Sequence, residues 1–165
     1  MKGSSREFKF SEITHVFTDF DGVLTDNKVY VDDTGREMVR CSRADGIGVQ
    51  LLQSADIEVI ILSSEENEVV EQRAAKLGIQ AITGLRHPHQ KADEIRRICN
   101  PDNAVFIGND INDIDALNCV GFPVVVADAH LRVIDIVLRT TEAHGGNGAF
   151  RELAEYILEM RKAEE

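Results

Sequence analysis

Several residue types are scarce in this chain of 165 residues, and each shortage excludes a class of protein. There is no tryptophan, and the three cysteines, Cys41, Cys99 and Cys119, include no C-x-x-C pair. We therefore expect neither a disulfide framework nor a zinc site of paired cysteines. No apolar run approaches the roughly 18–20 residues of a membrane helix. Residues 1–6 lack the apolar core of a signal peptide, so we expect a cytoplasmic protein with no membrane partner.

Positive charge is also in short supply. The chain has 18 lysines and arginines against 29 aspartates and glutamates, which gives a net charge of -11. A nucleic-acid-binding protein needs a basic surface to contact phosphates, so we expect no nucleic-acid partner. A small anionic substrate is not excluded, because a metal ion and one or two lysines can make a site locally positive.

Apolar runs alternate with amphipathic stretches along the sequence. Runs at residues 13–18, 58–62, 104–107 and 123–127 predict buried strands, with shorter strands at 81–82 and 136–138. Amphipathic stretches predict helices at residues 45–55, 65–77, 89–99, 113–118 and 149–161. Residues 28–40 alternate around a polar turn, which is typical of a β-hairpin. This order predicts an α/β fold, a parallel sheet in a three-layer arrangement, in one domain at residues 8–162.

The sharpest signal is a pair of carboxylates, Asp19 and Asp21, directly after the first predicted strand. Residues two apart in an extended chain point to the same side, so the two side chains face the same way. Gly22 then allows a tight turn. Ligands of parallel sheets bind beyond the carboxyl ends of the strands. Two other predicted strands end there in residues capable of chemistry: Ser63, and Asn109 with Asp110.

This pair of carboxylates fits phosphoryl transfer. The reaction needs an in-line nucleophile, a proton donor for the leaving oxygen and cations for the phosphoryl oxygens. Asp19 can be the nucleophile, which forms an aspartyl-phosphate, and Asp21 the general acid and base. Two like charges this close repel each other unless a cation lies between them, so the pair also predicts Mg²⁺. The alternative for the tripeptide alone is a surface turn, which the preceding apolar strand disfavours.

With these residues the chain resembles the haloacid dehalogenase superfamily of phosphatases. The resemblance covers about residues 10–160 and implies a Rossmann-like sheet. It implies that Ser63 holds a phosphate oxygen and that Lys91, at the start of a later helix, supplies a fixed cation to the same phosphate. The acidic loop at residues 108–113 completes the expected order. Each piece is weak alone, but their order and spacing together are a strong signal.

The third metal ligand stays open between two neighbouring residues. The related phosphatases usually carry two adjacent aspartates in this loop, and the first binds the metal; here Asn109 takes the first place and Asp110 the second. An asparagine oxygen can bind Mg²⁺, but it brings less charge and so weaker binding. We favour Asn109, with Asp113 orienting Lys91. The expected metal site comprises Asp19, Asp21, Asn109, Asp110 and Asp113.

Other segments resemble one subgroup, the capless sugar-acid phosphatases. They are residues 22–26, 43–46 and 145–152. No stretch is long enough for a cap domain, and only the hairpin at 28–40 follows the first motif as a small flap. The subgroup includes the phosphatases of 3-deoxy-octulosonate 8-phosphate and of nonulosonate (sialic acid-type) 9-phosphates. Its members resemble one another in forming tetramers in which a neighbour closes the open site, so we expect a homo-tetramer.

The residues after Ser63 bear on the sugar acid. The octulosonate enzymes tend to have Gly-Arg there, whereas this chain has Ser64-Glu65. The nonulosonate enzymes tend to have a glutamate there, with arginine and lysine on the next helix, which correspond to Glu65, Arg73 and Lys76. Arg73 and Lys76 share a helix face that suits a carboxylate, although plain solvated charge is the alternative. The resemblance thus implies a 2-keto-3-deoxy-nonulosonate 9-phosphate substrate, with 3-deoxy-D-manno-octulosonate 8-phosphate as the alternative.

Two other classes of function stay open. A non-catalytic domain, kept for oligomerisation or regulation beside sugar-acid activation, should have lost Asp19 or Asp21, and both are present. Asn109 is the one feature that favours it. A receiver-type signalling domain also forms an aspartyl-phosphate, but it leaves Asp21 without a role. The sequence therefore predicts a magnesium-dependent phosphomonoester hydrolase that acts on a sugar-acid phosphate.

Overall fold

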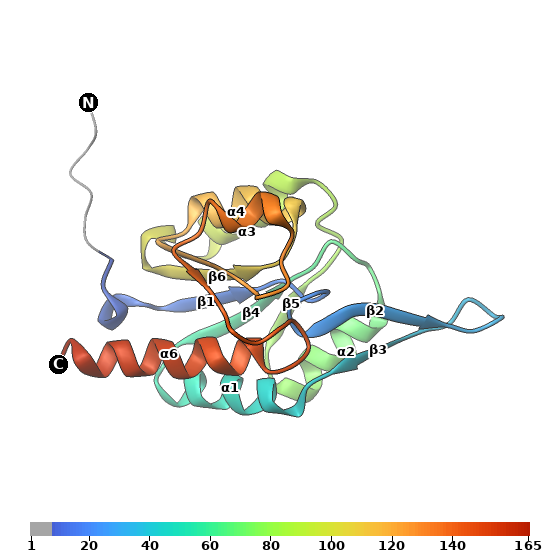
Figure 1. Cartoon of the computed structure of the whole chain (residues 1–165), viewed down its shortest axis with the longest axis horizontal. Helices are drawn as coiled ribbons and strands as arrows, with labels where there is room; N and C mark the ends of the chain where they lie inside the picture. The colour runs from blue at the N-terminus through green and yellow to red at the C-terminus, as the bar shows by residue number, and fades with distance from the viewer. Residues whose placement is uncertain (1–7) are drawn as a thin grey trace.

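The computed structural model describes residues 8–165, so the expectation that rested on residues 1–6 lies outside it. A parallel sheet runs through the described chain in the order β5-β4-β1-β6-β7-β8. Figure 1 shows it between two layers of helices. Its strands are β1 (His15–Thr18), β4 (Glu58–Leu62), β5 (Gln80–Ile82), β6 (Ala104–Gly108), β7 (Phe122–Val125) and β8 (Arg139–Thr140). The predicted α/β class and parallel sheet are confirmed.

Helices cover both faces of this sheet. They are α1 (Arg43–Ser54), α2 (Glu68–Leu77), α3 (Pro88–Ile98), α4 (Ile114–Cys119), α5 (Leu131–Ile134) and α6 (Ala149–Ala163). Helices α1 and α6 pack together on one face, and α3 and α4 pack together on the other (Figure 1). The expected three-layer arrangement is therefore present. Among the described helices, none has the length and apolar composition needed to cross a bilayer.

Strand β1 lies at the centre of the sheet, between β4 and β6. Its residues Val16 and Phe17 are fully buried. Thr18, at its end, is in register with Ile61 of β4 and Ile107 of β6. The amide of Asp19 continues this pairing by donating to the carbonyl of Ile107 at 3.0 Å. The carboxyl ends of the three central strands are thus level, which brings the residues that follow them to one edge.

The hairpin β2 (Thr25–Val31) and β3 (Glu37–Cys41) forms a separate two-stranded sheet that projects from the body (Figure 1). The carboxylate of Asp32 holds its turn by accepting from the amides of Thr34 and Arg36, both at 2.9 Å. The predicted flap is confirmed. No cap domain is present within residues 8–165, because this hairpin is the whole insertion between β1 and α1.

Some predicted boundaries were wrong. The helix expected at residues 65–77 begins at Glu68, because the Asn67 side chain caps it by accepting from the amide of Val69 at 3.0 Å. The strand expected at residues 136–138 instead occupies Arg139–Thr140 and pairs with β7. The sequence analysis missed the short helix α5. The first of these errors matters for function, since it leaves Glu65 in the loop after β4.

Candidate active site

A cavity of about 120 Å³ opens at the carboxyl edge of the sheet. The loops after β1, β4 and β6, together with the start of β2, supply its walls. Six of the predicted site residues line it: Asp19, Asp21, Ser63, Glu65, Asn109 and Asp110. Residues separated by as much as 91 positions in the chain therefore meet at one place because the three strand ends are level.

Asp19 is fixed by donors on one side of its carboxylate. It is 4% exposed, and its Oδ1 accepts from the amide of Phe20 at 2.8 Å and from Nζ of Lys91 at 3.0 Å. Burial and the neighbouring carboxylate of Asp113 raise the pKa of Asp19, Lys91 opposes both, and the net pKa is about 7. A buried carboxylate held in one orientation is suited to act as a nucleophile once a positive charge keeps it ionised.

Lys91 forms a buried triad with two carboxylates. Its side chain is 1% exposed, and Nζ lies 3.0 Å from Asp19 and 2.7 Å from Oδ1 of Asp113. Burial lowers the pKa of Lys91, but the two carboxylates outweigh this and leave it raised. Lys91 is thus a permanent cation directly beside Asp19.

Asp113 holds this lysine and the loop after β6 together. Its Oδ2 accepts from the amide of Asn109 at 2.8 Å and from that of Asp110 at 3.3 Å. With Oδ1 bonded to Lys91, both of its oxygens are engaged, and the side chain is fully buried. This geometry fits the expected role of orienting Lys91 and leaves Asp113 no free oxygen for a metal.

Asp21 has the environment of a proton donor. Its Oδ1 accepts from the hydroxyl of Thr25 at 3.3 Å. Burial raises its pKa, Thr25 opposes this, and the carboxylates of Glu65 and Glu37 raise it again. A carboxyl group with a raised pKa retains its proton more readily and can give it to a leaving oxygen.

Two serine hydroxyls and a side-chain amide line the opposite wall. Ser63 is 1% exposed, and its Oγ accepts from the amide of Glu65 at 3.2 Å. The side-chain nitrogen Nδ2 of Asn112 donates to Oγ of Ser64 at 3.1 Å and so links the loop after β4 to the loop after β6. The hydroxyl hydrogen of Ser63 is left to donate to an oxygen in the cavity.

The donor set at the floor of the cavity fits a divalent cation. The outer end of the Asn109 amide lies 3.3 Å from Oδ2 of Asp19 and 3.0 Å from the main-chain oxygen of Asp21. With the amide oxygen at this outer end, three oxygens converge, and oxygen is the ligand atom that Mg²⁺ prefers. Within residues 8–165 no three His, Cys, Asp or Glu side chains cluster as a metal site, because two of these ligands are an amide and a main-chain carbonyl.

Asp110, the other candidate ligand, is turned toward its own loop. Its Oδ1 accepts from the amide of Ile111 at 2.7 Å and caps the short turn that follows. The structure thus brings Asn109, not Asp110, against Asp19 and Asp21. The ligand assignment itself stays a prediction.

Known proteins with this architecture share both sequence and fold with the chain. No protein-family model matches it. A 3-deoxy-D-manno-octulosonate 8-phosphate phosphatase of Haemophilus influenzae is 33% identical over 156 residues, which cover 93% of this chain and 87% of the relative. The chain belongs to the capless sugar-acid phosphatases of the haloacid dehalogenase superfamily.

Two solved structures of this superfamily agree with the assignment. A putative hydrolase of the family from Streptomyces avermitilis is 37% identical, with a TM-score of 0.83 over 93% of this chain and 90% of that one. A 3-deoxy-D-manno-octulosonate 8-phosphate phosphatase from Moraxella catarrhalis, solved with magnesium, phosphate and KDO, is 26% identical, with a TM-score of 0.86 over 93% and 90% of the two chains.

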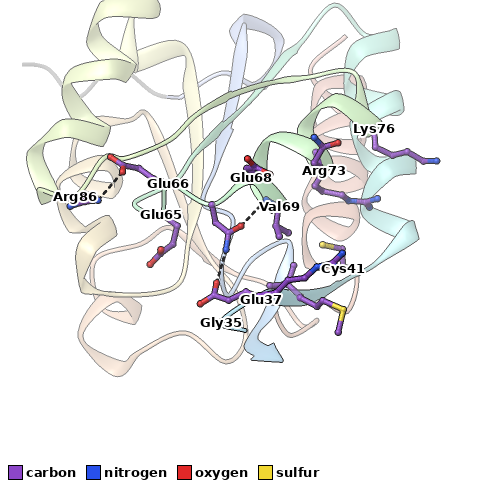
Figure 2. Close-up of a pocket in the computed structure, with 15 residues that line it drawn as sticks. Gly35, Glu37, Cys41, Glu65, Glu66, Glu68, Val69, Arg73, Lys76 and Arg86 are labelled. Atoms are coloured by element: carbon purple, nitrogen blue, oxygen red, sulfur yellow. Dashed lines mark hydrogen bonds and ion pairs between the residues drawn. The ribbon is translucent and has the colours of Figure 1, made fainter. Parts of the chain in front are cut away.

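Two of the predicted substrate residues lie away from the cavity of this family member. Arg73 and Lys76 line a wide groove between β3 and α2, which we call the hairpin groove. Figure 2 shows Glu65 toward one end of this groove and Lys76 toward the other. Arg73 is anchored there by donating to the carbonyl of Ser42 at 2.9 Å. Of the three predicted substrate residues, only Glu65 lines both the groove and the catalytic cavity.

The sequence analysis missed three polar residues around the cavity. Asn27 and Asn112 line it, and Thr25 bonds Asp21. Asn27 has a left-handed backbone, with φ at 63°, which asparagine tolerates better than most residues. Polar residues in loops are too common for their spacing to have indicated these positions. Thr25 was within reach, because it belongs to the first motif.

Proposed function

We propose that the protein is a magnesium-dependent phosphomonoester hydrolase whose substrate is a sugar-acid phosphate, with residues 8–162 as the catalytic domain. One observation carries this proposal. Asp19, bonded to a buried lysine, and Asp21, whose pKa is raised, lie together at the end of the central strand. This is the arrangement that a nucleophile and a separate proton donor need.

The chain's own residues supply the steps of the reaction. The carboxylate of Asp19 attacks phosphorus, and the bond to the leaving sugar oxygen breaks as Asp21 gives that oxygen its proton. Asp21, now ionised, takes a proton from the water that hydrolyses the aspartyl-phosphate. Lys91 and the Ser63 hydroxyl hold the phosphoryl oxygens. Asp19, the Asp21 carbonyl and Asn109 would hold Mg²⁺, which would supply further positive charge beside these oxygens.

The comparisons alter the expected order of substrates. The relatives are phosphatases of 3-deoxy-D-manno-octulosonate 8-phosphate, so they favour the alternative over the nonulosonate 9-phosphate that the sequence analysis placed first. We therefore place the octulosonate ester first. The nonulosonate ester remains the second candidate, because Glu65, the residue that distinguishes it by resemblance, lines the cavity.

The test is phosphate release from both esters and from p-nitrophenyl phosphate, with Mg²⁺ and after EDTA. We expect kcat/KM for the octulosonate ester to exceed that for the generic ester by at least about 100-fold, since contacts to the remote sugar contribute to catalysis. Glu65→Gln should alter the ratio between the two sugar acids, whereas Glu66→Gln, its neighbour outside the cavity, should not. If neither sugar ester reacts, the proposed function is refuted, and a non-catalytic domain for oligomerisation or regulation becomes the favoured hypothesis.

The hairpin supports an oligomer in which a neighbour completes the site. It exposes four apolar side chains: Val29 (51%), Tyr30 (67%), Val31 (60%) and Met38 (57%). Val29 and Val31 lie on one face of the hairpin, and Tyr30 with its cross-strand partner Met38 lies on the other. Exposed apolar side chains that gather on one projecting element favour a contact site. The cations of the hairpin groove also lie away from the cavity of their own chain. A tetramer, in which these features of one chain meet the open cavity of another, accounts for both.

Light scattering is expected to report about four times the 18.3 kDa of one chain. Arg73→Ala should raise KM for the sugar-acid ester by about 10-fold or more, because it removes a charged partner of the carboxylate, and leave KM for p-nitrophenyl phosphate nearly unchanged. Arg96→Ala, which removes an exposed arginine on α3, is the matched control. A fully active monomer, or equal losses on both substrates, contradicts this arrangement.

A further inference from the structure

The main chain of Asn109 is held rigidly on both sides. Its amide donates to Oδ2 of Asp113 at 2.8 Å, and its carbonyl accepts from the amide of His130 at 2.8 Å. The residue is 8% exposed. The loop therefore fixes the backbone from which the Asn109 side chain extends.

The outer end of this amide faces two groups that only accept hydrogen bonds. They are Oδ2 of Asp19 at 3.3 Å and the main-chain oxygen of Asp21 at 3.0 Å. An amide nitrogen at that position donates to both of them. An amide oxygen at the same position makes neither bond and is favourable only with a cation between the three oxygens. The two orientations of one side chain therefore suit two different states of the site.

The inner end of the amide packs against Gly22. A β-carbon added at Gly22 would lie 2.0 Å from Nδ2 of Asn109 and 2.5 Å from its Cγ. Gly22 has φ at 83°, a conformation that glycine adopts without strain. Because the nitrogen and oxygen of an amide are similar in size, a half-turn about the Cβ–Cγ bond exchanges them without further space.

We propose that the Asn109 amide is a reversible substitute for the cation: its NH₂ group bonds Asp19 and the Asp21 carbonyl in the metal-free protein, and a half-turn presents its oxygen to the metal. This deepens the proposed function by naming how one ligand exchanges. An aspartate at this position accepts in both states. It binds the cation with more charge, but without the metal it places a second carboxylate against buried Asp19, whose nearby cation Lys91 is already shared with Asp113. Compared with aspartate, asparagine at this position thus lowers the affinity for the metal and raises the stability of the metal-free protein.

The test compares Asn109→Asp with the parent in two measurements that need no catalysis. Calorimetric titration should show Mg²⁺ binding tightened by about 10-fold or more, since a charged ligand replaces a neutral one. Thermal unfolding in EDTA at pH 8 should show a Tm lower by about 4 °C or more. The matched control is Asp110→Asn, which makes the opposite substitution at the next residue. It should alter the Mg²⁺ affinity and the Tm much less.

Each outcome decides the proposal. Unchanged Mg²⁺ affinity, or an Asn109→Asp protein as stable as the parent in EDTA, overturns it, and so does loss of Mg²⁺ binding in Asp110→Asn. The parent protein provides a separate test if Asn109→Asp fails to fold. The side-chain NH₂ signals of ¹⁵N-labelled Asn109 should shift strongly when Mg²⁺ is added, and signals that stay in place refute the half-turn. These results stand even if no sugar ester is hydrolysed.

Discussion

Asp19→Asn is expected to lower phosphate release by roughly 10⁴-fold or more, the order of loss seen when an enzyme loses its nucleophile. The amide is isosteric with the carboxylate but does not attack phosphorus. It retains an oxygen that accepts from the amide of Phe20, as Oδ1 does at 2.8 Å. The variant should therefore fold, since replacing a buried carboxylate whose pKa is raised to about 7 removes a charge that is costly to bury.

Three measurements define this result. Steady-state phosphate release gives the loss, trapping with beryllium fluoride reports the aspartyl-phosphate site, and thermal unfolding reports the fold. Asp115→Asn, an exposed aspartate on α4, is the control and should match the parent in all three. Substantial turnover by a folded Asp19→Asn protein would rule out Asp19 as the nucleophile.

Lys91→Met is expected to destabilise the protein by about 3–5 kcal/mol, because it leaves two buried carboxylates without their cation. It should also reduce phosphate release by about 10³-fold, since the fixed positive charge beside the phosphoryl group is lost. Denaturant unfolding and steady-state kinetics measure the two effects. Lys162→Met, at the exposed end of α6, provides the control.

The pH dependence of the stability lost in Lys91→Met, which we call the deficit, separates the effect of the lysine charge from that of its packing. Burial raises the pKa of Asp19 to about 7 even with Lys91 present, and removal of the lysine raises it more. A group with a raised pKa in the folded state costs stability as the pH rises through that value, because folding then opposes its ionisation. The deficit should thus be large at pH 8 and clearly smaller at pH 5.5. A deficit that is equal at both values would mean that Lys91 acts through its aliphatic stem.

The sequence was sufficient to predict the sheet because its central strands are short apolar runs. The runs that contain Val59–Leu62 and Val105–Ile107 are buried on both faces. A strand buried on both faces needs apolar residues at every position, so an unbroken apolar run predicts it. The start of α2 was missed by three residues because Ser63, Ser64 and Asn67 are all possible cap residues, and only the hydrogen bond from the Val69 amide identifies Asn67. The position predicted for strand β8 was wrong because a strand of two residues is too short to show a hydrophobic periodicity.

The site was predictable to the extent that it follows the strand ends. Asp19, Ser63 and Asn109 each come directly after a central strand, so their convergence follows from parallel pairing. The spacing of Arg73 and Lys76 placed them on one helix face but carried no information on how far that face lies from the cavity. The three-dimensional arrangement sets that distance: α2 lies across the hairpin groove from β3, and the two cations line this groove.

The central place of β1 has a consequence for folding. Its partners β4 and β6 are far along the chain, with His15 paired to both Glu58 and Ala104. Strand pairs so far apart in the sequence form late and slowly during folding, because the chain between them loses conformational entropy before the stabilising contacts are made. The amide of Asp19 bonds the carbonyl of Ile107, so it should exchange with solvent deuterium only when the whole sheet opens. A nascent chain released before β6 is synthesised therefore has no active site at all, and the enzyme becomes competent in a single late step.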